Sequence, residues 1–322
     1  MSFRSTLEAI SLLDSAQVNG KEVIEYLRGL GLQHGEFATI HGDSGSTDFV
    51  KVLVPGSEGK SSGGHAPTLG VIGRLGGIGA RPEMIGLVSD GDGAVSALAV
   101  AIKLAHMAQK GDVLPGDVIV TTHICPNAPT QPHDPVPFMG SPVGMDTMNR
   151  YEVDSGMDAV LSIDTTKGNR VINHKGFAIS PTVKEGYILR ISEDLLEVMS
   201  IVTGRLPVTF PVTVQDITPY GNGLYHLNSI LQPATATSAP VVGVAITTET
   251  AVPGCATGAS HVVDIEQVVR FSVEVAKGFG TEKYSFFDEN EFDAIVRLYG
   301  PMNHLQTLGY HGEMTCVYPE LK

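Results

Sequence analysis

The chain has 322 residues, 42% of them hydrophobic and 17% charged, so it is long enough for one large domain or for a domain with a smaller partner. Its 35 acidic and 21 basic residues give a formal net charge of −14, which argues against nucleic acid and anionic lipid as partners. Three cysteines without a C-x-x-C spacing indicate a reducing compartment. The first residues resemble no secretory signal, and no apolar run approaches the about 20 residues that span a bilayer. We therefore expect a soluble, cytoplasmic protein.

The N-terminal part of the chain predicts helices followed by strands. Apolar spacing predicts a helix over residues 5–30, which the Asn19-Gly20 step can divide in two. Strands are expected at residues 37–41 and 48–54, before a Gly/Ser-rich loop at 57–67. Continuous apolar runs at 68–73, 117–122 and 157–164 predict buried strands.

Helices and loops separate these buried strands. A helix is expected over residues 92–110, and six prolines between 124 and 150 predict a long loop of the kind that is usually functional. Further strands are expected at 170–173, 177–184, 208–214 and 241–246, and further helices at 193–204, 264–278 and 286–299. Buried strands alternating with helices indicate a sheet covered on both faces, so the predicted class is α/β.

Two aspartates between glycines precede the helix at 92–110. The glycines let the backbone turn sharply and leave the carboxylates of Asp90 and Asp92 open to a metal ion. Asp-Gly is also common turn and N-cap chemistry, so a structural role is the alternative.

Three more residues of metal-binding type fall near the ends of predicted strands. His123 and Asp164 end two of the buried strands, and His261 follows the strand at 241–246 and precedes the next helix. Sites form outside the carboxyl ends of parallel strands, so we expect these side chains to converge with Asp90 and Asp92. Each has a structural alternative: a turn cap for Asp164, a core histidine for His123 and a helix-entry residue for His261.

This set of donors predicts a hydrolytic metal site. Imidazole and carboxylate ligands suit a divalent metal, with zinc as our prediction, as one or two ions. A metal-bound hydroxide would attack a carbonyl, while His123, or His133 in the proline-rich segment, moves the proton.

Other motifs give weaker signals. Residues 56–61 resemble a phosphate-binding loop, but the spacing is two residues short, and residues 73–79 lack the G-x-G-x-x-G register; we interpret both as loops. Cys125 lies two residues from His123, so a cysteine-based racemase or hydrolase is a third hypothesis.

The order of several segments resembles a known family. The resemblance rests on His41-Gly42-Asp43 through Asp48–Val52, Asp90–Leu98, Asp158–Asp164, Gly176–Ile179 and His261–Ile265. They are similar to the co-catalytic zinc aminopeptidases and related metallohydrolases, the glutamyl-aminopeptidase/cellulase-like branch especially. The chain looks closest to a bacterial and archaeal family that carries a domain-of-unknown-function label.

The resemblance implies a three-layer sandwich with a mixed, mostly parallel central sheet. It implies an aminopeptidase-like domain over residues 1–278, in which 165–240 is a candidate for a small inserted subdomain, and a C-terminal helix and tail over 279–322. It also implies a homo-oligomer, a bridging aspartate at Asp90 or Asp92, and a metal-bound aspartate at Asp164. A strict register puts His261 where the family has a glutamate and Thr257 where it has a histidine.

Two departures from the family concern catalysis. Arg74-Leu75-Gly76-Gly77 replaces its His-x-Asp, and residues 122–126 replace the Glu-Glu pair that supplies the general base. His123, His133 or Asp134 would have to substitute for that base. The leading hypothesis is a metal-dependent hydrolase of a peptide or amide-like small molecule, with rearranged ligands. The alternative is a catalytically degenerate member of this fold that serves as a ligand-binding or assembly subunit.

Overall fold

The N-terminal helices form as the sequence predicts. The computed structural model describes residues 1–81, 85–132, 138–166, 168–212, 227–249 and 260–306. Helix α1 (Ser2–Leu13) and helix α2 (Gly20–Gly29) are separated because the side chain of Asn19 accepts from Glu22 N and caps the second helix. The break at Asn19-Gly20 is therefore confirmed.

A mixed sheet of nine strands forms the centre of the molecule. Its order is β1-β2-β4-β3-β7-β11-β9-β10, and β8 also pairs with β11. The strands are β1 (Gly35–Gly42), β2 (Gly45–Val54), β3 (Leu69–Gly73), β4 (Val118–Ile124), β7 (Ala159–Thr165), β8 (Gly176–Ile179), β9 (Val183–Lys184), β10 (Tyr187–Ile188) and β11 (Val241–Thr247). The four central strands β4, β3, β7 and β11 are parallel, and the flanking pairs are antiparallel. A separate ribbon joins β5 (Thr130–Gln131) and β6 (Phe138–Met139).

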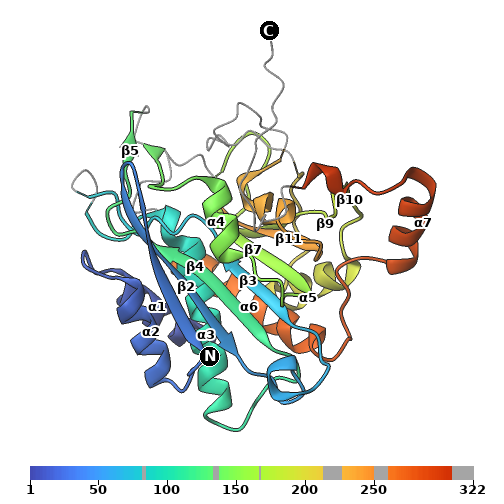
Figure 1. Cartoon of the computed structure of the whole chain (residues 1–322), viewed down its shortest axis with the longest axis horizontal. Helices are drawn as coiled ribbons and strands as arrows, with labels where there is room; N and C mark the ends of the chain where they lie inside the picture. The colour runs from blue at the N-terminus through green and yellow to red at the C-terminus, as the bar shows by residue number, and fades with distance from the viewer. Residues whose placement is uncertain (82–84, 133–137, 167, 213–226, 250–259, 307–322) are drawn as a thin grey trace.

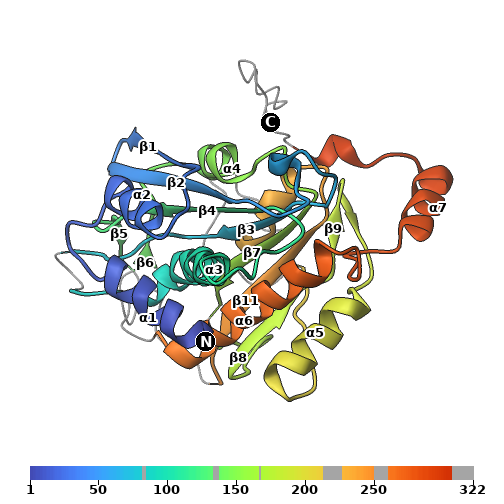
Figure 2. The same ribbon diagram turned by 90° about the horizontal axis from the view of Figure 1, so that it is seen from below.

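Helices cover both faces of this sheet, which confirms the α/β class. Helices α1, α3 (Asp92–Ala108), α5 (Glu193–Thr203) and α6 (Val262–Phe279) lie on one face (Figure 2). The other face carries the short helix α4 (Met145–Glu152) and the 3-10 helix η3 (Ser229–Thr235) (Figure 1). Alternate strand residues therefore enter two separate apolar clusters, as Val71 and Ile72 of β3 do.

Small residues let α3 approach the sheet closely. A Cβ atom on Gly93 would lie 2.4 Å from Arg74 O and 2.8 Å from Ile163 O, and one on Gly73 would lie 2.5 Å from Gly93 O. These contacts are with backbone atoms that cannot move aside. The start of α3 is therefore fixed against the carboxyl ends of β3 and β7.

Two predicted strands are wrong in whole or in part. Residues 170–173 form a turn, because Asn169 Oδ1 accepts from the backbone N–H groups of Val171 and Ile172. Of the strand expected at 208–214, the described residues contribute one isolated bridge, between Thr209 and Ile179. Helices α4 and η3 were not predicted.

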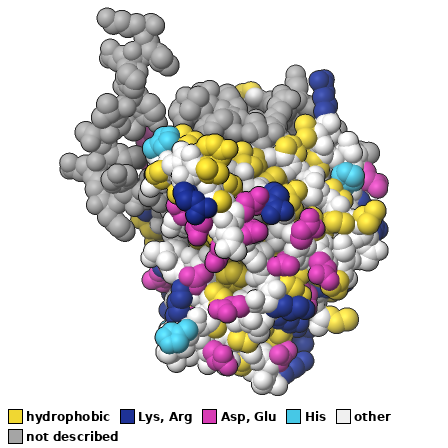
Figure 3. All heavy atoms as spheres, turned by 90° about the vertical axis from the view of Figure 1, so that its right-hand side faces the viewer, with side chains coloured by type: hydrophobic (Ala, Val, Ile, Leu, Met, Phe, Trp, Pro, Cys, Tyr) yellow, Lys and Arg dark blue, Asp and Glu magenta, His cyan; other side chains and the backbone are white. Residues whose placement is uncertain are grey.

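The last helix, α7 (Glu289–Tyr299), lies to one side of the sheet (Figure 1). Asp288 caps it, and Phe292 packs it against Tyr187 and Phe287. On the face that Figure 3 shows, acidic side chains are scattered among basic ones, and the coloured basic side chains do not gather into one patch. None of the helices in the described ranges has the length and apolar character that a membrane span needs.

Candidate functional site

The fold places a candidate site where β3 and β4 end. From β3 the chain continues into α3 on one face, whereas the segment after β4 leads to α4 on the opposite face. Neighbouring parallel strands that send the chain to opposite faces leave a crevice at their carboxyl ends, where α/β proteins bind ligands. Arg74 and His123 occupy this point.

Three buried side chains form what we call the edge network: Arg74, His123 and Glu152. Arg74 Nη1 donates to Glu152 Oε2 at 2.5 Å and to Asn149 Oδ1 at 3.3 Å. His123 Nδ1 lies 2.6 Å from Glu152 Oε1, and its Nε2 accepts from Gly76 N at 3.0 Å. Arg74 and Glu152 are 0% exposed. The network therefore links the ends of β3 and β4 to α4.

The surroundings of the edge network fix its protonation. Since the backbone N–H of Gly76 can only donate, Nε2 of His123 is the acceptor and the ring proton is on Nδ1, where it donates to Glu152. Burial alone would raise the pKa of Glu152, but the charge of Arg74 and the hydrogen bond from His123 outweigh it and hold this pKa below its usual range. Glu152 is thus a carboxylate and His123 a neutral imidazole.

The loop after β3 holds His123 closely. Leu75 has a φ of 51°, the left-handed region that residues other than glycine rarely occupy. A Cβ atom on Gly76 would lie 1.7 Å from His123 O, so only glycine fits there. Backbone strain of this kind often accompanies functional sites.

The three predicted aspartates are buried at the same end of the sheet but on different elements. Asp92 begins α3 and accepts from Ser260 Oγ. Asp164 lies on the α4 and η3 face, where its Oδ2 is 3.5 Å from Ser229 Oγ and its Oδ1 accepts from Thr165 N at 2.6 Å. Asp90 lies in the turn that precedes Asp92, 6% exposed.

The predicted histidines are placed differently. His261 precedes α6, its side chain is 55% exposed, and its Nδ1 lies 3.2 Å from Asp264 Oδ2. His123 is buried, with both ring nitrogens engaged in the edge network. His133, Asp134 and Thr257 lie outside the described residues.

The described donors do not fit a metal ion. Within the described ranges, no three His, Cys, Asp or Glu side chains are grouped as metal ligands. His123 would have to give up its bond to Glu152 or to Gly76 in order to bind one. We therefore derive no chemical step through a metal, and the zinc ligands remain a prediction from the sequence.

Cys125 does not have the character of a nucleophile. It is 2% exposed, and burial raises the pKa of its thiol to about 11. The thiolate that a cysteine mechanism requires is therefore scarce at neutral pH.

The loop at residues 56–61, which resembles a phosphate-binding loop, binds the carboxylate of Asp117. Asp117, directly before β4, accepts from Gly56 N, Ser61 N and Ser61 Oγ at 2.7–2.8 Å. A Cβ atom on Gly59 would lie 2.0 Å from Asp117 Oδ1. The amide groups of this segment thus bind a carboxylate of the chain itself, which agrees with its interpretation as a loop.

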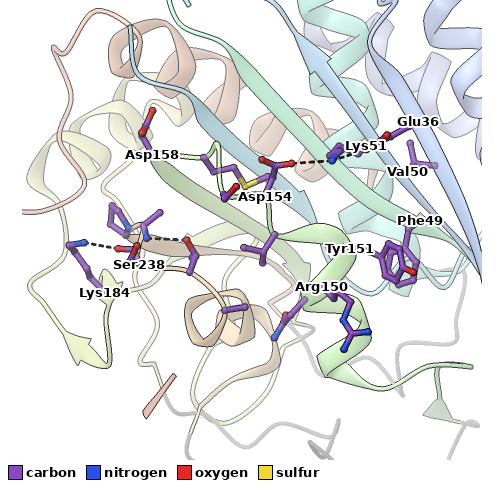
Figure 4. A pocket seen from close by; sticks show the side chains of 18 of the residues that line it. Glu36, Phe49, Val50, Lys51, Arg150, Tyr151, Asp154, Asp158, Lys184 and Ser238 are labelled. Carbon is purple, nitrogen blue, oxygen red and sulfur yellow. Dashed lines mark hydrogen bonds and ion pairs between the residues drawn. The ribbon is translucent and has the colours of Figure 1, made fainter. Parts of the chain in front are cut away.

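An open groove of about 990 Å³ runs along α4 toward the amino ends of β7 and β11 (Figure 4). The ion pair of Lys51 with Asp154 and the stacked rings of Phe49 and Tyr151 lie along it. Asn149 lines the groove and also accepts from Arg74. The groove therefore borders the edge network, although none of the predicted site residues lines it.

Sequence comparison assigns the family. Residues 38–309 match the model of a family described as "Protein of unknown function (DUF1177)". The chain belongs to this family. The matched span includes every residue of the edge network, and it confirms the predicted resemblance to a domain-of-unknown-function family. No curated protein matches the chain.

Sequence reasoning missed Glu152 and the role of Arg74. Arg74 follows an apolar strand directly, and a buried arginine needs a carboxylate partner. That signal predicts an acidic partner but not its position, because α4 was not predicted.

Proposed function

We propose that this protein is a hydrolase that acts on a small peptide or amide-like molecule at the carboxyl ends of β4, β3 and β7. The observation that carries the proposal is the buried pair of Glu152 and His123, 2.6 Å apart at the point where β3 and β4 diverge. A carboxylate that orients an imidazole through Nδ1 is a recurrent arrangement in hydrolytic enzymes.

In this proposal His123 acts as general base and then as general acid. Glu152 fixes the proton on Nδ1, so that Nε2 carries the lone pair, and Arg74 keeps Glu152 ionised. Nε2 exchanges its bond with Gly76 N–H for one with a water molecule and takes a proton from it. The oxygen of that water forms a bond to the amide carbon. His123 then returns the proton to the amine nitrogen as the carbon–nitrogen bond breaks.

The remote similarity to zinc aminopeptidases is part of the proposal and supplies the substrate class. In that family a metal site is expected, with Asp90, Asp92, Asp164 and His261 as the residues that would correspond.

A second candidate function is ligand binding without turnover. The bond between Gly76 N–H and His123 Nε2 favours it, because this bond occupies the lone pair that catalysis needs. A degenerate member of a hydrolase fold would retain such a closed network for stability alone.

Turnover of a dipeptide and acyl-amino-acid library, followed by mass spectrometry, tests the two functions. We expect His123→Gln to lower turnover by about 100-fold or more. His106→Gln is the matched control, because His106 also lies 2.7 Å from a glutamate, Glu8, but between α1 and α3. Equal turnover in His123→Gln and wild type would remove His123 from the mechanism, and no turnover of any substrate would leave the binding function.

Metal content is measured on the same preparations by elemental analysis. Stoichiometric zinc in the wild type that is lost in Asp164→Ala would restore the metal-dependent form of the hypothesis. Turnover of a substrate by protein that contains no metal would exclude the metal-dependent form of the hypothesis.

A further inference from the structure

One end of the central sheet is a long strand that has a neighbour on one side only in the described part of the chain. Strand β1 is the first in the sheet order, and Figure 2 shows it at the outer margin of the sheet. None of its eight residues is buried, and Phe37, near its middle, is 42% exposed. The strand at the other end of the order, β10, has only two residues. The exposed edge of the sheet is therefore that of β1.

The ladder between β1 and β2 determines which backbone groups point outward. Leu53 N donates to His34 O at 2.9 Å, and the antiparallel register then continues without a bulge along the whole of β1. Hydrogen-bonded and non-hydrogen-bonded pairs alternate along such a ladder. The odd-numbered residues of β1 therefore direct their N–H and C=O groups away from β2.

Three consecutive outward positions have free backbone groups: Phe37, Thr39 and His41. Within the described ranges, the N–H and C=O groups of these residues make no further hydrogen bond. The fourth outward position, Gly35, is already bonded through its carbonyl oxygen, which accepts from Arg28 Nη2 at 2.9 Å. The open stretch of the edge is therefore centred on Thr39.

Strand β1 lacks the features with which edge strands avoid pairing, such as proline, lysine, a bulge or a cover. It contains neither proline nor lysine, and its carboxylate, Glu36, is paired with Lys51 at 2.7 Å. Pro142 lies over the face of β1 and not over its edge, because a Cβ atom on Gly42 would meet Pro142 O and would point out of the sheet. The edge is therefore open to another strand.

We propose that β1 pairs with β1 of a second copy of this chain, antiparallel about a twofold axis at Thr39. In this register Thr39 lies opposite Thr39 of the second copy, and Phe37 lies opposite His41. Every free N–H and C=O group of these three residues then gains a partner. The central sheets of the two copies join into one continuous sheet.

The side chains of β1 favour a second copy as the partner. In this register Ala38 lies opposite Ile40 of the second copy, so apolar side chains meet on one face of the joined sheet. Glu36 lies opposite Gly42, so like charges do not face each other across the pair. The net charge of −14 on each chain opposes association at long range, and salt screens this repulsion. We therefore expect tighter association at higher ionic strength.

Thr39→Pro tests the proposal, because proline removes an N–H group that β2 does not use. An edge strand tolerates proline where this position faces outward. Sedimentation equilibrium of the wild type should give the mass of two chains, and Thr39→Pro should raise the dissociation constant by about tenfold or more. Thr39→Val is the matched control: it also loses the side-chain bond to Asp48 but keeps the N–H group, so its dissociation constant should equal that of the wild type.

A cross-linking experiment locates the axis and does not depend on the folding of the proline variant. Opposite residues of a hydrogen-bonded pair have Cα atoms about 5.5 Å apart, within the range of about 4.4–6.8 Å that a disulfide spans. Thr39→Cys should therefore give covalent dimers on oxidation with copper phenanthroline. Glu36→Cys is the control on the same strand, because the two copies of position 36 would lie about 20 Å apart. The wild type gives the background of the native cysteines.

Three outcomes would overturn the inference: a wild type with the mass of one chain at all concentrations and salt conditions, an unchanged dissociation constant in a folded Thr39→Pro, or equal cross-linking of Thr39→Cys and Glu36→Cys. The last two mean that copies associate through another surface. A monomeric wild type that binds a strand-forming peptide would assign the edge to a different partner. The inference does not rest on the proposed hydrolase activity, because β1 contributes no residue to the edge network.

Discussion

At the scale of single residues, the edge network decides both stability and chemistry. Arg74 and Glu152 are fully buried, and their charges are compensated mainly by each other. Such a pair adds little net stability compared with apolar residues, but the loss of one partner leaves an uncompensated charge in the interior.

We predict that Glu152→Gln destabilises the protein by about 3–5 kcal/mol. The substitution leaves the buried charge of Arg74 without a carboxylate partner and weakens the hydrogen bond from His123 Nδ1. Urea unfolding measures this. Glu291→Gln is the control: Glu291 pairs with Arg190 on the surface, so its loss should cost less than about 1 kcal/mol. A double variant, Arg74→Met with Glu152→Leu, should recover part of the loss. Equal effects of Glu152→Gln and Glu291→Gln would contradict the assigned role of the network.

At the scale of elements, the close approach of α3 to the sheet determines where the site lies. Gly93 lies against the carbonyl groups of Arg74 and Ile163, so the helix holds the ends of β3 and β7 in place. Glycine at this position is what permits the close contact between the start of α3 and the sheet.

We predict that Gly93→Ala destabilises the protein by about 1–3 kcal/mol or more, because its Cβ would meet backbone oxygen atoms at 2.4–2.8 Å. Gly29→Ala is the control, since nothing lies within 4 Å of a Cβ at that helical position. It should stabilise α2 by about 0.5–1 kcal/mol. Thermal unfolding of the two variants gives the comparison, and a neutral Gly93→Ala would show that α3 can move away from β3.

Elements were predicted best from the sequence where the apolar pattern of a segment matches its burial in the fold. The apolar runs of β3, β4, β7 and β11 identify buried strands because both faces of the sheet are covered. Helix α4 lies among prolines, and its few buried residues include Asn149 and Glu152, so apolar spacing does not reveal it. Residues 170–173 look like a strand, but the side chain of Asn169 forms a turn instead.

The site could be predicted only in its location. Strand-end reasoning led to His123 and Asp164, which do lie at the carboxyl ends of the parallel strands. The partners of His123 depend on α4 and on the loop after β3, which are tertiary contacts between positions far apart in sequence. Sequence reasoning for Arg74 stopped at its departure from the family pattern, whereas the structure pairs it with Glu152.

At the scale of the whole molecule, buried and paired carboxylates link folding to pH. Burial raises the pKa of Asp154, but the N–H of Gly156 and the ammonium of Lys51 outweigh it, and the pKa of Glu152 is also lowered. A carboxylate whose pKa is lower in the folded than in the unfolded chain binds fewer protons when folded. Its stabilising contribution is complete above the unfolded value of about 4 and is lost as the pH falls through the folded value.

We therefore predict that the free energy of unfolding of the wild type decreases as the pH falls below about 4.5. The decrease should be smaller in Glu152→Gln, because glutamine does not titrate and the variant lacks the protonation step that destabilises the folded wild type. Urea unfolding at a series of pH values, at constant ionic strength, measures both curves. Asp154→Asn should reduce the pH dependence of the free energy of unfolding less than Glu152→Gln does. Asp154 is only partly buried, and solvent screens its ion pair with Lys51. Parallel curves for wild type and Glu152→Gln would mean that the pKa of Glu152 is the same in the folded and the unfolded chain, which would contradict the stabilisation of its carboxylate by Arg74 and His123.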